Sequence, residues 1–390
     1  MIRSISISNY KSINKLDELK FGYFNFLIGP NGAGKTTLIS AIDLTRKLAS
    51  GKNIDESVEQ TTSFSTEFFN QYSSNNLTDI SITVKDNHGE LYNLKYSIGS
   101  ELGQYEIAQE SLTRLLKDAE IPIYTRNHKE FNASAGKDNK LDAVPLVIKD
   151  NELALSTYNN PVVNEVAKLI SGYKVLWVDK TWDEAHKFKV HFQDKLDQNN
   201  LDGLAVSLYR NNKSNFNKAM AIIEQLIPGF KTPTFNIARR ANEDEEEDKK
   251  NIDPYFVMWN EADTNLSYSL RGLSEGNFRI IQLILAIFSC NKSTCLIGEE
   301  IENGLHFGRI KTLLEVLRHL SSKLDVQLIF TTHSLEILGH VSPSDVIFSS
   351  RDEKGYSLYE NLDNKHNTEF VKQQLDREPT AKDYIDLGMV

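Results

Sequence analysis

The chain has 390 residues, of which 40% are hydrophobic and 25% are charged, and its formal net charge is −10. This composition is typical of a folded globular protein, and the sequence contains no apolar run of about 18 residues that would cross a membrane. The negative charge argues against a protein that wraps duplex nucleic acid over a broad surface. A local basic groove that binds DNA is still compatible with this charge. Cys290 and Cys295 are the only cysteines, and the N-terminus lacks the apolar core of a signal peptide. We therefore expect a reduced, cytoplasmic protein with two buried thiols.

The first elements frame a glycine-rich loop. Residues 3–10 alternate between apolar and polar, which predicts a strand, and the apolar run 24–28 predicts a second, buried strand. Apolar residues at helical spacing then predict a helix over 35–47. Between them, Gly29 to Thr36 reads GPNGAGKT, followed by Thr37, and matches the phosphate-loop pattern G-x-x-x-x-G-K-[ST] at every fixed position.

The chemistry of this loop predicts a nucleoside triphosphate as ligand. Glycines let successive backbone N–H groups turn around a phosphate, and the helix N-terminus adds its positive end. Lys35 is expected to reach the β- and γ-phosphates, and the Thr36 hydroxyl to hold Mg²⁺. The predicted ATP-binding residues of the loop are Asn31, Gly32, Ala33, Gly34, Lys35, Thr36 and Thr37.

The middle of the chain predicts an antiparallel β patch and then helices. Strands are expected at 79–84, 91–98 and 104–108, and later at 121–125 and 173–178. Helices are expected at 162–170 and over 202–226, the latter in one or two pieces. We divide the chain into an N-terminal ATPase part with the β patch (1–110), an inserted, largely helical lobe (111–252), a C-terminal ATPase part (253–350) and a tail (351–390). The acidic run 242–248 is interpreted as a solvated loop or an acidic docking site.

Strands and helices alternate again in the C-terminal part. Strands are expected at 254–260, 266–270, 294–298 and 326–330, and helices at 276–289 and 310–320. Such alternation is typical of a parallel α/β sheet. Because the phosphate loop is N-terminal, this mixed sheet must be assembled from both ends of the chain.

Three short motifs in this part supply the remaining chemistry of a phosphate site. The strand at 294–298 runs directly into Glu299, which we assign to Mg²⁺, and Glu300, which we assign to the attacking water. Ser274 and Gly276 open a helix and suit a second anion contact. His333 follows the strand at 326–330, where an imidazole could bond a γ-phosphate. The predicted catalytic residues are thus Lys35, Glu300 and His333.

The order GPNGAGKTT, LSEGN, LIGEEIENGLH and TTHS resembles that of ABC-type P-loop ATPases of the SMC/RecF/OLD group, and within it the stand-alone OLD-like AAA ATPases. The resemblance implies an α/β ATPase head that forms homodimers or higher oligomers around ATP, with the Ser274 loop of one copy at the γ-phosphate held by the other. Three positions depart from the pattern: Glu299 replaces Asp, Ile301 replaces Pro, and Glu275 replaces Gly or Asp. Gln71 is the only residue that we consider for a glutamine loop.

The resemblance also suggests a biological role. OLD nucleases carry a nuclease domain after the ATPase, but the segment after His333 is too short for one at ordinary domain sizes. We therefore expect a Mg²⁺-dependent ATPase that acts as a nucleotide-driven switch in an anti-phage system and controls a separate nuclease or toxin effector. The alternatives are a RecF- or SMC-like DNA-repair clamp and a nucleotide-gated scaffold with negligible hydrolysis.

Overall fold

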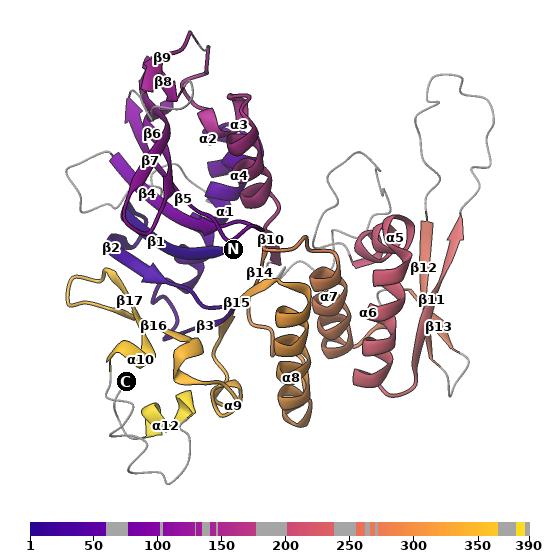
Figure 1. Ribbon diagram of the computed structural model, residues 1–390. Coiled ribbons are helices and arrows are strands. Elements are labelled where there is room, and N and C mark those ends of the chain that lie inside the picture. Colours follow the sequence, from indigo (N-terminus) through magenta and orange to yellow (C-terminus); the bar gives the residue numbers. More distant parts are fainter. Residues whose placement is uncertain are drawn as a thin grey trace. The chain divides into compact units, whose positions relative to one another are not determined.

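The computed structural model describes residues 1–59, 77–101, 104–128, 130–134, 141–145, 147–176, 201–237, 255–261, 266–269, 272–365 and 380–386 (Figure 1). Gln71 and the acidic run 242–248 lie outside these ranges. The chain forms two compact units. The first comprises Met1–Tyr173, Asn291–Ile297 and Asp325–Val390, and the second Lys174–Cys290 and Gly298–Leu324. Among the described residues, no helix has the length and apolar character needed to cross a membrane.

An antiparallel sheet of eight strands dominates the N-terminal part of the first unit. Its strands follow the order β2-β1-β4-β5-β6-β7-β8-β9. Their bounds are β1 (Ile2–Tyr10), β2 (Ile13–Lys20), β4 (Leu77–Lys85), β5 (Leu91–Glu101), β6 (Gln104–Leu115), β7 (Glu120–Asn127), β8 (Glu130–Ser134) and β9 (Leu141–Ala143). The patch expected from the sequence therefore continues to residue 143, and the predicted boundary at 110/111 falls inside β6.

The two faces of this sheet differ sharply because apolar and polar residues alternate along its strands. Buried residues such as Ile80, Ile82 and Leu94 form one face. Helices α1 (Lys35–Ala49), α2 (Ile54–Glu59), α3 (Ala154–Thr157) and α4 (Pro161–Ser171) belong to the same unit, and α2, α3 and α4 each contact α1. On the other face, cross-strand pairs such as Ser81–Lys95 and Lys95–Ser111 are polar.

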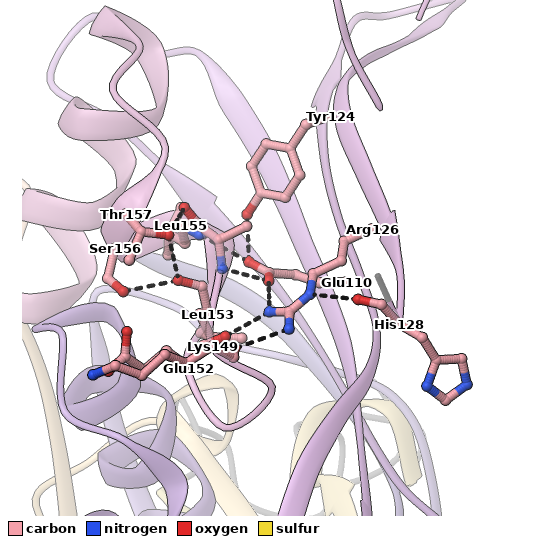
Figure 2. A network of polar contacts seen from close by, with 11 residues as sticks. Glu110, Tyr124, Arg126, His128, Lys149, Glu152, Leu153, Leu155, Ser156 and Thr157 are labelled. Atoms are coloured by element: carbon pink, nitrogen blue, oxygen red, sulfur yellow. Dashed lines mark hydrogen bonds and ion pairs between the residues drawn. The ribbon is translucent and has the colours of Figure 1, made fainter. Parts of the chain in front are cut away.

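A buried polar network ties strands β6 and β7 to the start of α3 (Figure 2). The Glu110 carboxylate accepts hydrogen bonds from the Tyr124 hydroxyl (2.6 Å) and from the backbone N–H groups of Ala154 (2.7 Å) and Leu155 (2.9 Å). The Arg126 guanidinium lies 4.0 Å from it and donates to the carbonyls of Lys149, Glu152 and His128. Burial raises the pKa of Glu110, and these donors counteract that shift.

The parallel sheet of the first unit is built from both ends of the chain, as the sequence predicts. Within this unit its strands follow the order β14-β15-β3-β16-β17 (Figure 1). Their bounds are β3 (Phe24–Ile28), β14 (Cys295–Gly298), β15 (Gln327–Thr332), β16 (Val346–Arg351) and β17 (Ser357–Asn361). β3 pairs in parallel with β15 on one side and with β16 on the other, and β17 pairs antiparallel with β16. Short helical elements complete the unit: α9 (Leu335–Leu338), η3 (Pro343–Asp345), α10 (Leu362–Lys365) and α12 (Ala381–Asp386).

In its described residues, the second unit combines four helices with a small sheet. The helices are α5 (Leu201–Asn211), α6 (Lys213–Leu226), α7 (Glu275–Phe288) and α8 (Phe307–Leu324), so the helical stretch predicted over 202–226 consists of two pieces. The sheet has the order β11-β12-β13, with bounds β11 (Phe230–Ile237), β12 (Tyr255–Glu261) and β13 (Ser267–Tyr268). The short strand β10 (Lys174–Leu176) opens the unit.

Both cysteines are free thiols, as expected. Cys295 is fully buried in β14, because the whole of that strand is covered. Cys290 is only half-buried, since it lies just after the end of α7. The prediction of two buried thiols therefore holds for one of them.

Candidate functional site

The phosphate loop connects β3 to α1 in the first unit. All five residues of β3 are buried, and α1 begins at Lys35 after Gly34, which has a φ of 104°. The Lys35 side chain is 7% exposed, and its ammonium group donates to the carbonyls of Gly29 (2.8 Å) and Pro30 (3.0 Å). The ammonium group thus lies over the loop that the sequence predicts to surround phosphate. Of the other predicted ligands, Ala33 and Gly34 are buried, Asn31, Gly32 and Thr36 are exposed, and Thr37 is half-buried.

His333 lies at the same edge of the parallel sheet as this loop. β15 and β3 are parallel, and Thr332 is in register with Ile28. The next residues of the two strands, His333 and Gly29, therefore leave the sheet at the same level. His333 is exposed, so its imidazole is accessible to a ligand. The first unit thus brings two of the predicted motifs together.

The remaining motifs lie in the second unit, around the start of α7. Ser274 caps this helix, and its hydroxyl accepts a hydrogen bond from the Asn277 N–H at 3.3 Å. Ser274 itself is exposed, whereas Gly276 is buried. A side chain at Gly276 would collide with the carbonyl of Gly304, which belongs to the loop after the predicted carboxylates. The glycine therefore lets the signature turn (Ser274–Asn277) pack closely against that loop.

Glu299 and Glu300 follow β14 and are both half-buried. The backbone N–H of Glu299 donates to the Leu176 carbonyl at 3.2 Å. Glu300 adopts a φ of 44°, which is uncommon for a residue with a side chain, and its carboxylate accepts a hydrogen bond from Asn303 at 2.6 Å. These contacts fix the backbone and orient the carboxylate at the point where the sequence places the catalytic base.

Arg279 is a residue of this region that the sequence analysis missed. It lies in α7, is 8% exposed, and its Nε atom has no hydrogen-bond partner among the residues that the structure describes. Burial lowers the pKa of its guanidinium, while Glu275, Glu300, Glu299 and Glu302 act in the opposite direction. A charged residue inside the apolar run FRIIQLILAIF is the sequence signal that could have identified it. Arg279 supplies positive charge close to the predicted metal and water residues.

The predicted metal ligands are chemically suited to Mg²⁺. The Thr36 hydroxyl and the Glu299 carboxylate are hard oxygen donors, and Mg²⁺ is commonly bound by one or two carboxylates together with substrate phosphates and waters. Over the ranges that the structure describes, no group of three or more His, Cys, Asp or Glu residues forms a metal cage. Taken singly, the Thr36 hydroxyl and the Glu299 carboxylate thus have the ligand chemistry that Mg²⁺ prefers.

A cavity of about 470 Å³ lies on the eight-stranded sheet, and none of the predicted site residues lines it. Hydroxyl and amide side chains from five neighbouring strands dominate its lining, among them Ser8, Ser97, Gln109 and Asn127. Lys95 is its single lysine, and Asp79 is held by the Ser97 hydroxyl at 2.5 Å. No sequence pattern predicts this cavity, because its residues come together only through strand pairing.

Comparisons with known proteins identify the fold. Residues 24–339 match the AAA_21 family, described as "AAA domain, putative AbiEii toxin, Type IV TA system". No curated protein matches the chain. An SMC head crystallised with the C-winged helix domain of ScpA is 13% identical, with a TM-score of 0.58 over 94% of this chain and 99% of that one. An SMC head with an extended coiled coil, solved with the C-terminal domain of ScpA derived from Pyrococcus furiosus, is 11% identical, with a TM-score of 0.56 over 96% and 99%.

These similarities agree with the order of the motifs and with the sheet built from both chain ends. At such low identity the SMC heads establish the fold alone, and the family match covers most of the chain. The OLD-like assignment within this group stays a prediction. The chain belongs to the AAA_21 family and has the P-loop ATPase fold of SMC heads.

Proposed function

We propose that this protein is a Mg²⁺-dependent ATPase in which two copies close around ATP and act as a switch. The observation that carries the proposal is the presence of two complementary halves. The first unit has Lys35 and His333 at one sheet edge, and the second has Ser274 at the start of α7, whose buried Arg279 interacts with Glu300. ATP-driven closure would bring Ser274 of one copy to the phosphates held by the other.

Each residue has a distinct part in the proposed reaction. The loop and Lys35 bind the triphosphate, while Thr36 and Glu299 hold Mg²⁺, which would neutralise charge that develops on the phosphates. Glu300 orients the attacking water and accepts its proton. His333 donates a hydrogen bond to the γ-phosphate, and the N-terminal end of α7 offers Ser274 as a further donor.

The proposed biological role is control of a separate effector, a nuclease or a toxin, in an anti-phage system. The description of the family, "putative AbiEii toxin, Type IV TA system", supports a role in a system of more than one protein, although it attaches the toxin label to the AAA family itself. An SMC head bound to a domain of ScpA offers a precedent for a partner protein on this fold. A DNA-repair clamp and a scaffold with negligible hydrolysis are the competing functions.

Glu300→Gln tests the enzymatic part. The amide keeps the size of the side chain but cannot accept the proton, so phosphate release should fall by about 100-fold or more. ATP binding should persist, and the variant should accumulate as a dimer in the presence of ATP. Light scattering measures this dimer. Wild-type hydrolysis in this variant would refute the assignment of Glu300. Negligible hydrolysis by the wild-type protein would favour the scaffold.

Mixed dimers test the shared site. Lys35→Ala and Ser274→Arg subunits should each be inactive alone, whereas mixing them leaves one intact site per heterodimer. About half of the activity per heterodimer should return. Failure of verified mixed dimers to recover activity would refute the two-copy site. Native co-purification then separates the roles: an associated nuclease or toxin supports the effector role, and a clean homodimer with tight DNA binding supports the clamp.

A further inference from the structure

The hairpin formed by β16 and β17 lies directly against the phosphate loop. Three of its side chains donate hydrogen bonds to three backbone carbonyls at or before the start of α1. The pairs are Ser349 Oγ to Ile28 O (3.0 Å), Arg351 Nε to Gly32 O (2.6 Å) and Tyr359 Oη to Gly34 O (2.6 Å). The hairpin therefore holds the loop at its beginning, its middle and its end.

These contacts act on the groups that would bind phosphate. In a trans peptide the C=O and the following N–H point in opposite directions. When Tyr359 holds the Gly34 carbonyl, it also directs the N–H of Lys35 to the opposite side. Arg351 likewise fixes the peptide between Gly32 and Ala33. The hairpin thereby helps to fix these peptide planes, together with the helical hydrogen bond from the Leu38 N–H to the Gly34 carbonyl (3.0 Å) and the turn hydrogen bond from the Ala33 N–H to the Pro30 carbonyl (3.2 Å).

The two glycines that the phosphate-loop pattern fixes at its ends are the ones that face the hairpin. A Cβ on Gly29 would collide with the Ser349 backbone, and a Cβ on Gly34 would collide with Ser357 and Tyr359. The loop and the hairpin therefore pack without space for a side chain between them. This close approach keeps the donors of the hairpin within reach of the carbonyls.

The Tyr359 hydroxyl is well suited to a permanent contact. The side chain is 7% exposed, and burial raises the pKa of the phenol well above its ordinary value. It therefore remains a protonated donor. Ser12 extends the connection, since its hydroxyl lies 2.8 Å from that of Ser357 and 3.3 Å from that of Thr37 in the first turn of α1.

We propose that Tyr359 and Arg351 are positioning residues for ATP, because their side chains set the peptide planes of the phosphate loop and hence its affinity for the triphosphate. The inference rests on the proposed nucleotide binding and adds a second layer of residues behind it. Neither residue needs to contact ATP through its side chain for this role. Their loss should raise the KM for ATP and leave kcat within about twofold, because they act on binding rather than on the attacking water.

Tyr359→Phe removes the hydroxyl alone. A lost hydrogen bond of about 1 kcal/mol corresponds to a roughly fivefold weaker Kd for ATP and ADP, measured by calorimetry at a temperature where the protein is fully folded. Tyr124→Phe is the matched control, because it removes another buried hydroxyl with a 2.6 Å hydrogen bond, far along the chain from the loop. An unchanged Kd in Tyr359→Phe, or the same loss in the control, would overturn the proposal.

Arg351→Lys separates geometry from charge. Lysine keeps the positive charge but lacks the planar Nε donor, so ATP affinity should fall by about threefold to tenfold. Wild-type affinity in this variant would overturn the assignment of Arg351. If the wild-type protein itself fails to bind ATP, the proposed function falls together with this inference. If only the variants behave as wild type, the proposed function stands and this inference falls.

Discussion

The phosphate loop and the signature turn each precede a helix and each carry predicted phosphate ligands, yet they are supported differently. The loop is held through its carbonyls, by donors of one hairpin and by its own Lys35. The turn lies on a helix whose buried Arg279 faces several carboxylates. Fixed hydrogen bonds keep the loop in one geometry, whereas the energy of a cluster of one cation and four carboxylates changes when another charge approaches it. We therefore expect the first unit to govern affinity and the second to govern turnover.

The largest expected effect separates the two halves directly. Lys35→Ala removes the cation over the loop, so ATP affinity should fall by at least about 100-fold. Ser274→Arg should leave the affinity of the isolated copy within about threefold, because the signature turn is proposed to act on the other copy. Calorimetry on the monomer measures both constants. An equal loss of ATP affinity in the two variants would contradict the proposal that the phosphate loop binds ATP and that the signature turn acts only when two copies close.

A second prediction concerns a charged group in the first unit that lies away from the loop. Glu110→Gln places an amide where the carboxylate accepts from three donors, and removes the charge near Arg126. Unfolding free energy should fall by about 2–3 kcal/mol, measured by chemical denaturation. The exposed Glu130→Gln is the control and should stay within about 0.5 kcal/mol. ATP affinity should not change, and a change would mean that the network reaches the loop.

Arg279→Gln tests the charge cluster of the second unit. Without the guanidinium, the nearby carboxylates lose the cation that offsets their repulsion, so kcat should fall by about tenfold to 30-fold. KM should change little, because Arg279 is buried in α7 rather than in the loop. Steady-state kinetics separate the two parameters, and Arg279→Lys should recover part of kcat. A change in KM with an unchanged kcat would contradict the expectation that the second unit governs turnover.

The smallest effect is a pH dependence within the second unit. Burial raises the pKa of Asp202 from 3.8 to about 6, while its hydrogen bond from the Trp259 indole (3.1 Å) counteracts the shift. The folded state therefore binds more protons than the unfolded state between about pH 4 and pH 6, so this group lowers stability as the pH rises through that window. Asp202→Asn should stabilise the protein at pH 7 by about 1–2 kcal/mol and have little effect at pH 4. Denaturation at both pH values measures this, and equal effects would refute the shift.

The sequence was most informative where the relevant residues are contiguous. The phosphate loop, the strand before it and the helix after it depend on local spacing, and β3 and α1 appear where predicted. The alternation of strands and helices in the C-terminal part likewise predicted a parallel sheet. A helix between two strands returns the chain to the end of the sheet where the first strand began, so that the next strand runs parallel to it. The roles of the individual site residues stay predictions, since they depend on a ligand.

Features that depend on distant partners escaped sequence analysis. Tyr359 belongs to no recognisable sequence motif. Its hydroxyl reaches the Gly34 carbonyl only because strand pairing brings the two residues together. Arg279 is conspicuous within an apolar run, but only folding shows which carboxylates face it. The extension of the antiparallel patch to β9 was missed because its last strands are short and polar.

The position of β3 has a consequence for biosynthesis. Both of its neighbours in the sheet, β15 and β16, come from the last part of the chain. While a ribosome is still making the middle of the protein, the strand before the phosphate loop has no partner to pair with, because such long-range contacts form late. The nascent chain therefore cannot complete its nucleotide-binding edge before β15 and β16 have emerged. Competence to bind ATP would therefore report that the chain has been made at least as far as β16.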